Sequence, residues 1–294
     1  MAKTSFSGPV RSENGFKLIS KNTTSGLISE RTVHDLGIKD TRRYYLEEYF
    51  DLLPGINGDL ASTTESTNTP VSRQFEILGT NHTSALATYG ATVAGMAMTT
   101  ATADQDRMIV APHLDTKQGA WAGIKWGTEN QVHWECSIRT SAAIDNQWIW
   151  AGLKLTNVVE CATDDDSAFF AFGTDADNSG QAFDDFTKLH FCHSVGDTDY
   201  ISVLPITVAA STNYHLKIKF DSDRKMEIFV DGEQYNVTST SGSTGGTAVT
   251  KGTTKSGAMT NDVDLIPYIG IENCDAAAAV LNVQFEAISR LIFE

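Results

Sequence analysis

Acid-rich loops come closest to a recognisable binding chemistry in this sequence. Asp175, Asp177 and Ser179 occupy alternate positions before Gly180, which is how a calcium-binding loop places its first oxygen ligands and its glycine. The twelfth position holds Phe186 instead of the Glu that would close such a loop. A solvated turn is therefore the better explanation, with calcium at Asp175, Asp177 and Ser179 as the alternative. No other cofactor is indicated.

Paired carboxylates with the spacing of a sugar-cleaving enzyme are missing from the sequence. Retaining glycoside hydrolysis needs two carboxylates about 5 Å apart, which a strand displays on one face at alternate positions. The nearest acidic segments, Glu47-Glu48 and Glu272-Asn273-Cys274-Asp275, have the wrong spacing. A polysaccharide hydrolase is therefore the weakest functional hypothesis, and we predict no catalytic residues and no enzyme activity.

Histidine and serine motifs do not indicate catalysis either. His190 and His193 are three residues apart, so on a strand they point to opposite faces and do not easily share a metal ion. The sequence contains no Gly-x-Ser-x-Gly motif and no glycine-rich phosphate loop.

Five tryptophans fall within residues 121–150, and two of them share a predicted strand. Trp148 and Trp150 flank Ile149, so both point to one face of that strand. Burial in a core is the usual place for such side chains, and stacking on a carbohydrate is the alternative.

The segment 213–235 predicts the architecture that must position these residues. Tyr214, Leu216, Ile218 and Phe220 alternate with polar residues, and a second alternating run covers 226–230, so the segment predicts a β-hairpin. Its turn is the polar stretch 221–225, and the second strand ends at Val230-Asp231-Gly232.

Short strand-like runs follow one another from residue 75 to the C-terminus, separated by Gly, Asn, Asp and Thr clusters. This pattern predicts two packed antiparallel sheets, a jelly-roll sandwich over residues 71–294. The segment 241–257 is almost entirely small and polar, and we expect an exposed, flexible loop there.

The N-terminal quarter differs from the rest of the sequence. Residues 1–33 are polar with isolated apolar side chains and cannot fold alone, so we expect an extended anchoring arm. Residues 34–70 predict a short helix, ending at Pro54-Gly55, and a Ser/Thr linker over 61–70. The candidate anchoring residues are Phe6, Val10, Arg11, Phe16, Leu18 and Ile19, and the candidate helix and oligomer contacts are Tyr44, Tyr45, Tyr49 and Phe50.

The charge balance and the apolar runs exclude several partners. The chain of 294 residues has a net charge of -15, which opposes broad contact with nucleic acid. No apolar run is long enough to span a bilayer, and the N-terminus lacks the apolar region of a secretory signal, so we expect cytoplasmic synthesis. The four cysteines, which show no Cys-x-x-Cys spacing, are expected to be buried thiols.

Two family resemblances can be drawn from particular segments. The segments 134–140, 148–155, 167–174, 213–232 and 265–272, with the closing strand, resemble the concanavalin A-like or laminin-G-like jelly-roll sandwiches, a fold shared by lectins, glycosidases, adhesion modules and viral coat proteins. The opening MAKTSFSGPVRSENGF and the segments 109–116, 122–140 and 148–157 resemble virion structural proteins of marine tailed bacteriophages, including cyanophages. This second resemblance implies a particle component.

These observations together predict a non-catalytic phage virion protein. We expect a capsid decoration or auxiliary protein on the capsid exterior, assembled in the host cytoplasm and anchored to the shell by its arm. Its partners would be the major capsid protein or other virion proteins, and repeated small contacts favour a homo-oligomer, with a trimer as the first guess. The alternative is a head or tail fibre module that binds a host glycan.

Overall fold

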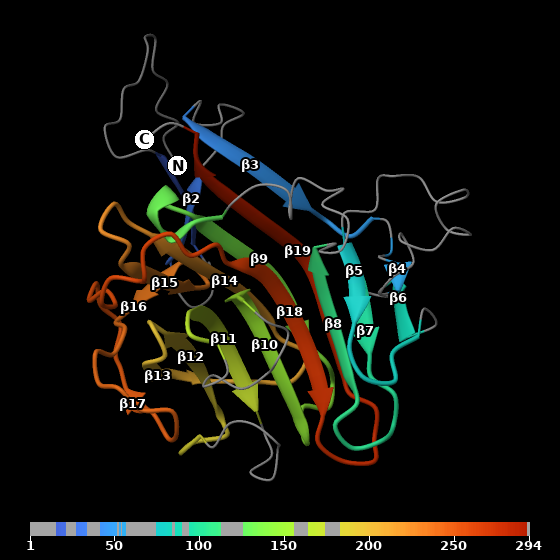
Figure 1. The fold of residues 1–294 in the computed structure, drawn as a ribbon. Coiled ribbons are helices and arrows are strands. Elements are labelled where there is room, and N and C mark those ends of the chain that lie inside the picture. The colour runs from blue at the N-terminus through green and yellow to red at the C-terminus, as the bar shows by residue number, and fades with distance from the viewer. Residues whose placement is uncertain are drawn as a thin grey trace, which may run out of the picture. The chain divides into compact units, whose positions relative to one another are not determined.

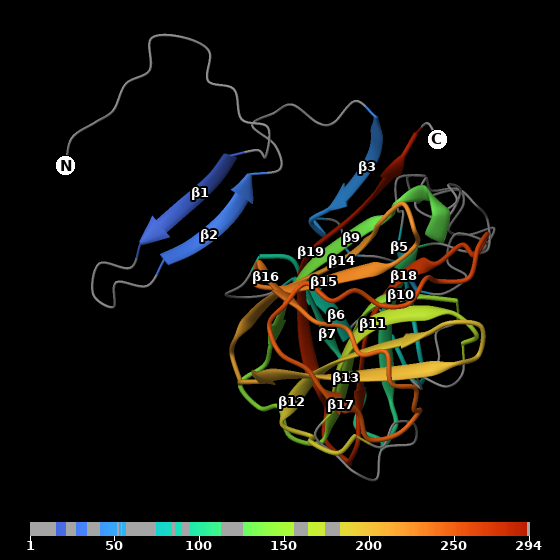
Figure 2. The same cartoon turned by 90° about the vertical axis from the view of Figure 1, so that its left-hand side faces the viewer.

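The protein is mainly β in its computed structural model, and its chain divides into two units, Met1–Arg43 and Tyr44–Glu294. The structure describes residues 16–21, 28–33, 42–51, 53, 55–56, 75–83, 86–89, 94–112, 126–155, 164–173 and 183–292. In the first unit, β1 (Phe16–Lys21) and β2 (Ile28–Val33) pair antiparallel as a separate two-stranded sheet (Figure 2).

The second unit is a sandwich of two sheets (Figure 1). The nine-stranded sheet has the order β17-β13-β12-β11-β10-β18-β8-β5-β4. In that order its strands are Thr247–Ala248, Asp199–Thr207, Lys188–Ser194, Ser167–Gly173, Gln147–Lys154, Ile266–Asn273, Arg107–Pro112, Phe75–Leu78 and Gly55–Ile56.

The eight-stranded sheet has the order β16-β15-β14-β9-β19-β7-β6, with β3 (Arg43–Glu48) also paired to β19. In that order its strands are Glu233–Tyr235, Met226–Val230, Asn213–Phe220, His133–Thr140, Val280–Leu291, Met96–Thr99 and Ala87–Tyr89. The printed pairings are antiparallel except β13 with β17 and β4 with β5. The expected two-sheet antiparallel sandwich is therefore confirmed.

The main core lies between the two sheets and follows from residue alternation. In β9, Trp134, Cys136 and Ile138 are buried while the residues between them are partly exposed. Strands β10 and β11 differ, because every residue in both is buried. Both faces of the central nine-stranded sheet are therefore covered.

The segment 213–235 folds as predicted. Asp221 accepts backbone N–H bonds from Asp223 and Lys225 through its side chain and so closes the turn between β14 and β15. Asp231 and Gly232 both have positive φ, 51° and 84°, and join Val230 to Glu233 as a two-residue hairpin turn. This is the backbone that an Asp-Gly turn provides.

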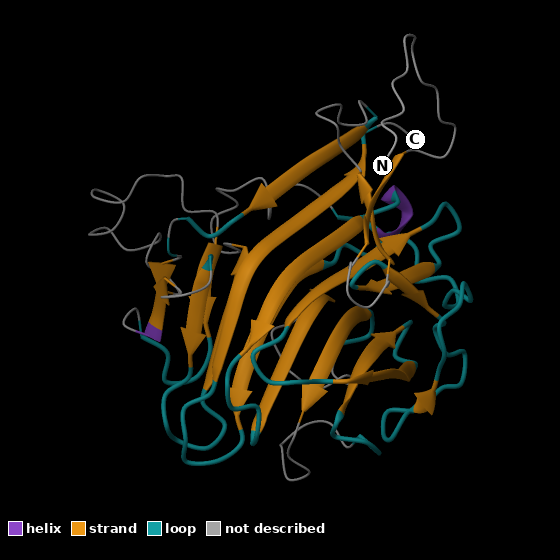
Figure 3. Ribbon diagram, turned by 180° about the vertical axis from the view of Figure 1, so that it is seen from behind, coloured by secondary structure: helices purple, strands orange, loops and turns teal. Residues whose placement is uncertain are grey.

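The helix expected near residue 44 is wrong, because residues 43–48 form the strand β3. Their alternation is ambiguous over so short a stretch, and pairing with β19 decides in favour of a strand. In the described chain, helix is confined to very short segments such as the 3₁₀ turn Thr128–Asn130 (Figure 3). No described helix has the length and apolar character needed to cross a membrane.

The polar segment 241–257 is mostly exposed, as expected, but it is fastened to the sandwich. The Gly242 N–H donates to Asp199 O over 2.8 Å, and the Val249 N–H donates to Val203 O over 3.0 Å. Ser256 is buried, and its Oγ accepts the Met226 N–H. Backbone hydrogen bonds therefore hold most of this loop in one path.

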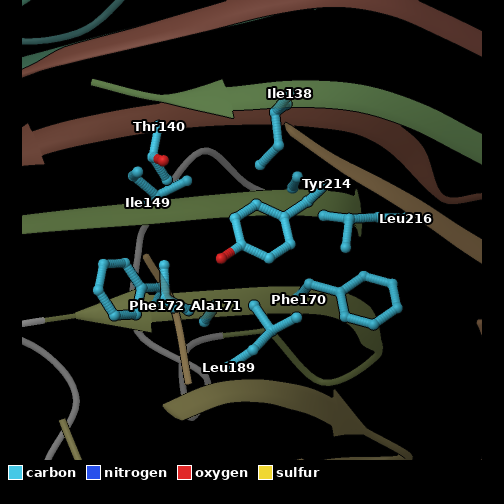
Figure 4. A pocket seen from close by; sticks show the side chains of 11 residues that line it. Ile138, Thr140, Ile149, Phe170, Ala171, Phe172, Leu189, Tyr214 and Leu216 are labelled. Atoms are coloured by element: carbon cyan, nitrogen blue, oxygen red, sulfur yellow. The ribbon is translucent and has the colours of Figure 1, made fainter. Parts of the chain in front are cut away.

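A small cavity lies between the sheets (Figure 4). Its volume of about 20 Å³ is lined mainly by apolar side chains, including Ile138, Leu216, Ile149, Phe170 and Leu189. That volume holds about one water molecule. The cavity is therefore a packing defect of the core and not a substrate site.

Candidate functional site

The strongest cluster of chemically capable side chains lies on the face of the nine-stranded sheet turned away from the sandwich core, called the outer face below. Ile149 and Ala151 of β10 point into the main core, whereas Trp148 and Trp150 belong to a second apolar cluster on the opposite face. Strand pairing places Glu272 opposite Trp148, and Tyr268 opposite Gly152. The outer face therefore combines aromatic and ionisable groups.

Glycines make room for the two indole rings. A Cβ atom at Gly173 would collide with the Trp148 ring, and one at Gly270 would collide with the Trp150 ring. Both tryptophans are about 1% exposed. The predicted sharing of one face by Trp148 and Trp150 is confirmed, and so is their burial, although the second cluster and not the main core buries them.

Two ion pairs lie on or beside the outer face. Lys154 Nζ is 3.6 Å from Asp164 Oδ2, both side chains are fully buried, and the ammonium group lies 4.3 Å from the centre of the Phe169 ring. Glu272 is fully buried and pairs with Arg107 Nε. Each buried carboxylate thus has a cationic neighbour, which offsets the cost of burying it.

Burial also sets the protonation of the remaining titratable groups on this face. Burial, with the charges of Asp164 and Glu76, raises the pKa of Tyr268 to about 12. Burial lowers the pKa of His190 to about 4, and its ring stacks on Phe183 with the ring centres 3.6 Å apart. At neutral pH both side chains are therefore uncharged.

The indole N–H groups add two hydrogen-bond donors to the outer face. Within the described part of the chain, neither Trp148 Nε1 nor Trp150 Nε1 has an acceptor, although both atoms are buried. Buried indole N–H groups usually find a partner. Aromatic rings, neutral donors and internally balanced ion pairs are a chemistry suited to a neutral, polyhydroxylated ligand.

A second candidate site lies at an edge of the eight-stranded sheet and is called the tyrosine edge below, defined as Tyr44, Tyr49 and Tyr89. These three side chains are 36%, 59% and 54% exposed, the largest exposed rings of the described chain. Tyr49 contacts Phe285 with ring centres 5.0 Å apart, and Tyr89 Oη donates to Asp51 O over 2.7 Å. The edge is therefore locally ordered and presents aromatic surface.

A buried carboxyl group lies close behind this edge. Glu286 of β19 is about 1% exposed, and burial, with the charge of Glu48, raises its pKa to about 8 against the hydrogen bond from Trp134. A register shift between Val283 and Phe285 changes which residues of β19 face inward, so Glu286 joins the core side. Its position between the sheets keeps this acid away from any substrate.

The structure describes only some of the residues singled out from the sequence. Asp175, Asp177, Ser179, Phe6, Val10 and Arg11 and the linker 61–70 lie outside the described residues. Phe16, Leu18 and Ile19 are on β1, opposite Val33, Arg31 and Glu30 of β2.

The aromatic residues expected on a helix are divided between the surface and the core. Tyr44 and Tyr49 are exposed, Tyr45 is partly buried, and Phe50 is buried in its own sandwich against Phe75. Tyr44 and Tyr49 are therefore the members of this set that a neighbouring subunit can reach.

The candidate metal ligands are not brought together in the described residues. No group of three or more His, Cys, Asp or Glu side chains there could hold a metal ion. His190 stacks on Phe183 on the outer face, whereas His193 stacks on Tyr200, with ring centres 4.6 Å apart. The expectation that His190 and His193 do not share an ion agrees with these separate surroundings.

The residues missed in the sequence are Lys154, Asp164, Tyr268 and Glu286. Each is a single polar residue in or beside an apolar strand, and its partners are distant in sequence, as with Trp134 and Glu286. A lone charged residue within a strand such as β10 was the only available signal.

The fold is that of a concanavalin A-like sandwich, mainly β with two largely antiparallel sheets. No protein-family description matches the sequence, and no curated protein matches it.

Several solved structures have a related arrangement of strands at low sequence identity. A family 16 glycoside hydrolase endo-glucanase from Bacteroides ovatus is 8% identical, with 83% of this chain and 99% of that chain covered and a TM-score of 0.48. A protein of unknown function from Shewanella oneidensis MR-1 is 9% identical, with 85% and 87% covered and a TM-score of 0.46. A carbohydrate esterase from the Shiga toxin-encoding bacteriophage phi24B is 14% identical, with 77% and 94% covered and a TM-score of 0.40. Similarity at this level assigns no function to this chain.

Proposed function

We propose that the protein is a non-catalytic structural component of a phage particle, a capsid decoration or auxiliary protein anchored to the shell through its N-terminal unit. The observation that carries this proposal is the division of the chain into a large sandwich and a small unit, Met1–Arg43, whose two strands form a sheet of their own. A two-stranded hairpin alone is marginally stable in water. Such a unit gains stability by binding another surface.

The sequence of the N-terminal unit supports the same proposal. Its opening residues 1–16 resemble virion structural proteins of marine tailed phages, and its polar composition is that of a segment that orders on binding. In a particle, one weak contact is repeated over many symmetric copies, so a small unit is enough to hold a large domain.

The absence of catalysis is proposed from the state of the ionisable groups on the outer face. Glu272 and Asp164 are buried, and each has a cationic neighbour, Arg107 and Lys154. A carboxylate held in this way has a structural use. Glu286, whose raised pKa would suit an acid catalyst, lies in the core.

The partners and location follow from the same proposal. The N-terminal unit binds the major capsid protein or another virion protein, and the sandwich lies on the capsid exterior after assembly in the host cytoplasm. The net charge of -15 suits an outward-facing part better than one packed against DNA. The protein acts as a homo-oligomer, with a trimer as the expected form.

Purified particles of the phage that carries the chain give the test. Mass spectrometry of the particles is expected to detect the protein, and cryo-electron microscopy is expected to place its sandwich density on the head surface. Density at the tail alone would overturn the capsid assignment, and absence from purified particles would overturn the proposal as a whole.

A second candidate function is carbohydrate binding by a head or tail fibre module, favoured by the outer face. The buried indole N–H groups of Trp148 and Trp150 have no acceptor within the described chain, and sugar hydroxyls would accept from them. Glycan-array binding by the full chain, weakened about tenfold in the Trp148→Phe/Trp150→Phe variant, would support this function. Absence of binding to host polysaccharides would reject it.

The weakest candidate is hydrolysis of a host polysaccharide. A reducing-sugar assay on host envelope material is expected to show no release by the purified protein. Release that disappears in a Glu272→Gln variant of unchanged thermal stability would contradict the non-catalytic assignment.

A further inference from the structure

We propose that the tyrosine edge binds the N-terminal unit of a second copy of this chain, so that copies are joined by exchange of their β1–β2 hairpins. This inference rests on the proposed function, in which the N-terminal unit binds subunits of the particle, and it names one of those subunits. The occupant is residues 16–33 of the neighbouring copy, and the site is β3 with Tyr44, Tyr49 and Tyr89.

Charge complementarity gives the first argument for this occupant. Residues 1–43 contain eight Lys or Arg and four Asp or Glu, whereas residues 44–294 contain 14 and 33. The N-terminal unit is therefore basic by 4 charges, and the sandwich is acidic by 19. Opposite fields of this kind attract the two parts to each other and keep the sandwiches apart.

The exposed charges of the sandwich have the same bias. Among fully exposed charged side chains in its described residues, 11 are acidic and one, Lys251, is basic. Glu47 and Asp51 are two of the acidic ones, and both lie beside the tyrosine edge. A basic hairpin that approaches this edge therefore meets acidic and aromatic groups together.

Strand pairing gives the second argument. Among the described strands, β3 pairs with β19 alone, and β1 and β2 pair only with each other. An edge strand with one neighbour can accept another strand through its backbone, and exposed aromatic side chains add contact area. A hairpin joined to β3 becomes part of a larger sheet, which removes the weakness of a two-stranded sheet.

The choice of a second copy over the same chain follows from how the chain divides. Residues 1–43 cluster apart from the sandwich, and β2 is not paired with β3 of its own chain although only residues 34–42 separate them. Exchange of an identical element between copies is a common route to oligomers. Pairing within one chain is the competing outcome that the experiment must separate.

Cross-linking of mixed isotopic populations separates the two outcomes. Full-length chain carrying a photoreactive phenylalanine at Tyr49 is prepared in normal and ¹⁵N-labelled forms, mixed, irradiated and digested. Cross-links between Tyr49 peptides and peptides from residues 1–33 are expected in mixed-isotope form. Cross-links of one isotope only would show pairing within the chain, and no cross-link to residues 1–33 would show a different occupant; either result would overturn the inference.

Charge reversal gives an independent readout with a matched control. The Lys17→Glu/Lys21→Glu variant removes the net positive charge of the N-terminal unit, and its dissociation constant in sedimentation analysis is expected to rise at least about tenfold at low salt. Screening should reduce that difference at about 1 M salt. The control, Lys225→Glu/Lys251→Glu, changes the total charge equally within the sandwich and is expected to associate like the wild type or more tightly. Equal weakening by both variants would overturn the inference.

The two proposals fail in distinguishable ways. A full-length chain that is monomeric at every salt concentration, yet is present in purified particles, would reject the hairpin exchange and leave the virion function intact. A chain that exchanges hairpins but is absent from particles would reject the virion function alone.

Discussion

The indole N–H of Trp134 donates a 2.8 Å hydrogen bond to Oε1 of Glu286, across the pairing of β9 with β19 and inside the sandwich core. Both residues are almost fully buried. A neutral carboxyl group is what such surroundings stabilise, and the raised pKa of Glu286 agrees with this. The pair joins the two central strands of the eight-stranded sheet.

The protonation of Glu286 predicts a pH-dependent stability. Its pKa rises from the usual 4.5 to about 8 in the folded protein, so the folded state keeps a proton that the unfolded chain releases. The contribution is complete below about pH 4.5 and is lost as the pH rises toward 8, by about 1.4 kcal/mol per pH unit. Urea unfolding between about pH 7 and 8 is expected to show this fall in the wild type and a flatter profile in Glu286→Gln.

Glu135 supplies the control for that experiment. Burial would raise its pKa, but hydrogen bonds and charge from His215 and Lys217 outweigh burial and lower it to about 2. Its contribution is therefore lost only at acid pH, and Glu135→Gln should keep the wild-type slope between about pH 7 and 8. A Glu286→Gln variant with an unchanged slope would contradict the assignment of the proton.

The close approach of Trp150 to Gly270 predicts a strong effect of one methyl group. Gly270→Ala places a Cβ atom within the Trp150 ring, so we expect a loss of about 1–3 kcal/mol in the free energy of unfolding. Gly257→Ala is the control, because no atom lies within 4 Å of its Cβ position. Equal thermal stability of both variants would show that the outer face packs more loosely than described.

The buried pair of Lys154 and Asp164 predicts non-additive substitutions. Lys154→Met leaves the Asp164 carboxylate buried beside an apolar side chain, and we expect it to cost about 3–5 kcal/mol. Asp164→Asn keeps an acceptor for the Leu155 N–H, so the double variant should be less destabilised than the sum of the single ones. Urea unfolding of all four proteins measures the coupling, and additive losses would argue against a direct interaction.

The sandwich could be predicted from the sequence where alternation is regular. The segment 213–235 has apolar residues at alternate positions and an Asp-Gly turn, and it folds as two strands followed by a tight turn. The segment 43–48 was mistaken for helix, because Tyr44, Tyr45 and Leu46 fit either period over six residues. Its pairing with β19, more than 200 residues away, was not visible.

The candidate sites were harder to predict, because they depend on long-range pairing. Trp148 and Trp150 could be placed on one face, but their glycine neighbours Gly173 and Gly270 come from two other strands. Glu286 faces inward because the register shift after Val283 changes the alternation, and no residue pattern marks that shift. The tyrosine edge also depends on Tyr89 lying near Asp51.

The most direct test of the central claim, that the N-terminal unit attaches this protein to other subunits, compares particle incorporation of the full chain with that of residues 44–294, each supplied during infection with a C-terminal tag. Circular dichroism and thermal unfolding of both purified proteins establish first that the sandwich folds without residues 1–43. Quantitative mass spectrometry of purified particles should then find the full chain and at least about tenfold less of residues 44–294. Equal incorporation of the two proteins would contradict the account.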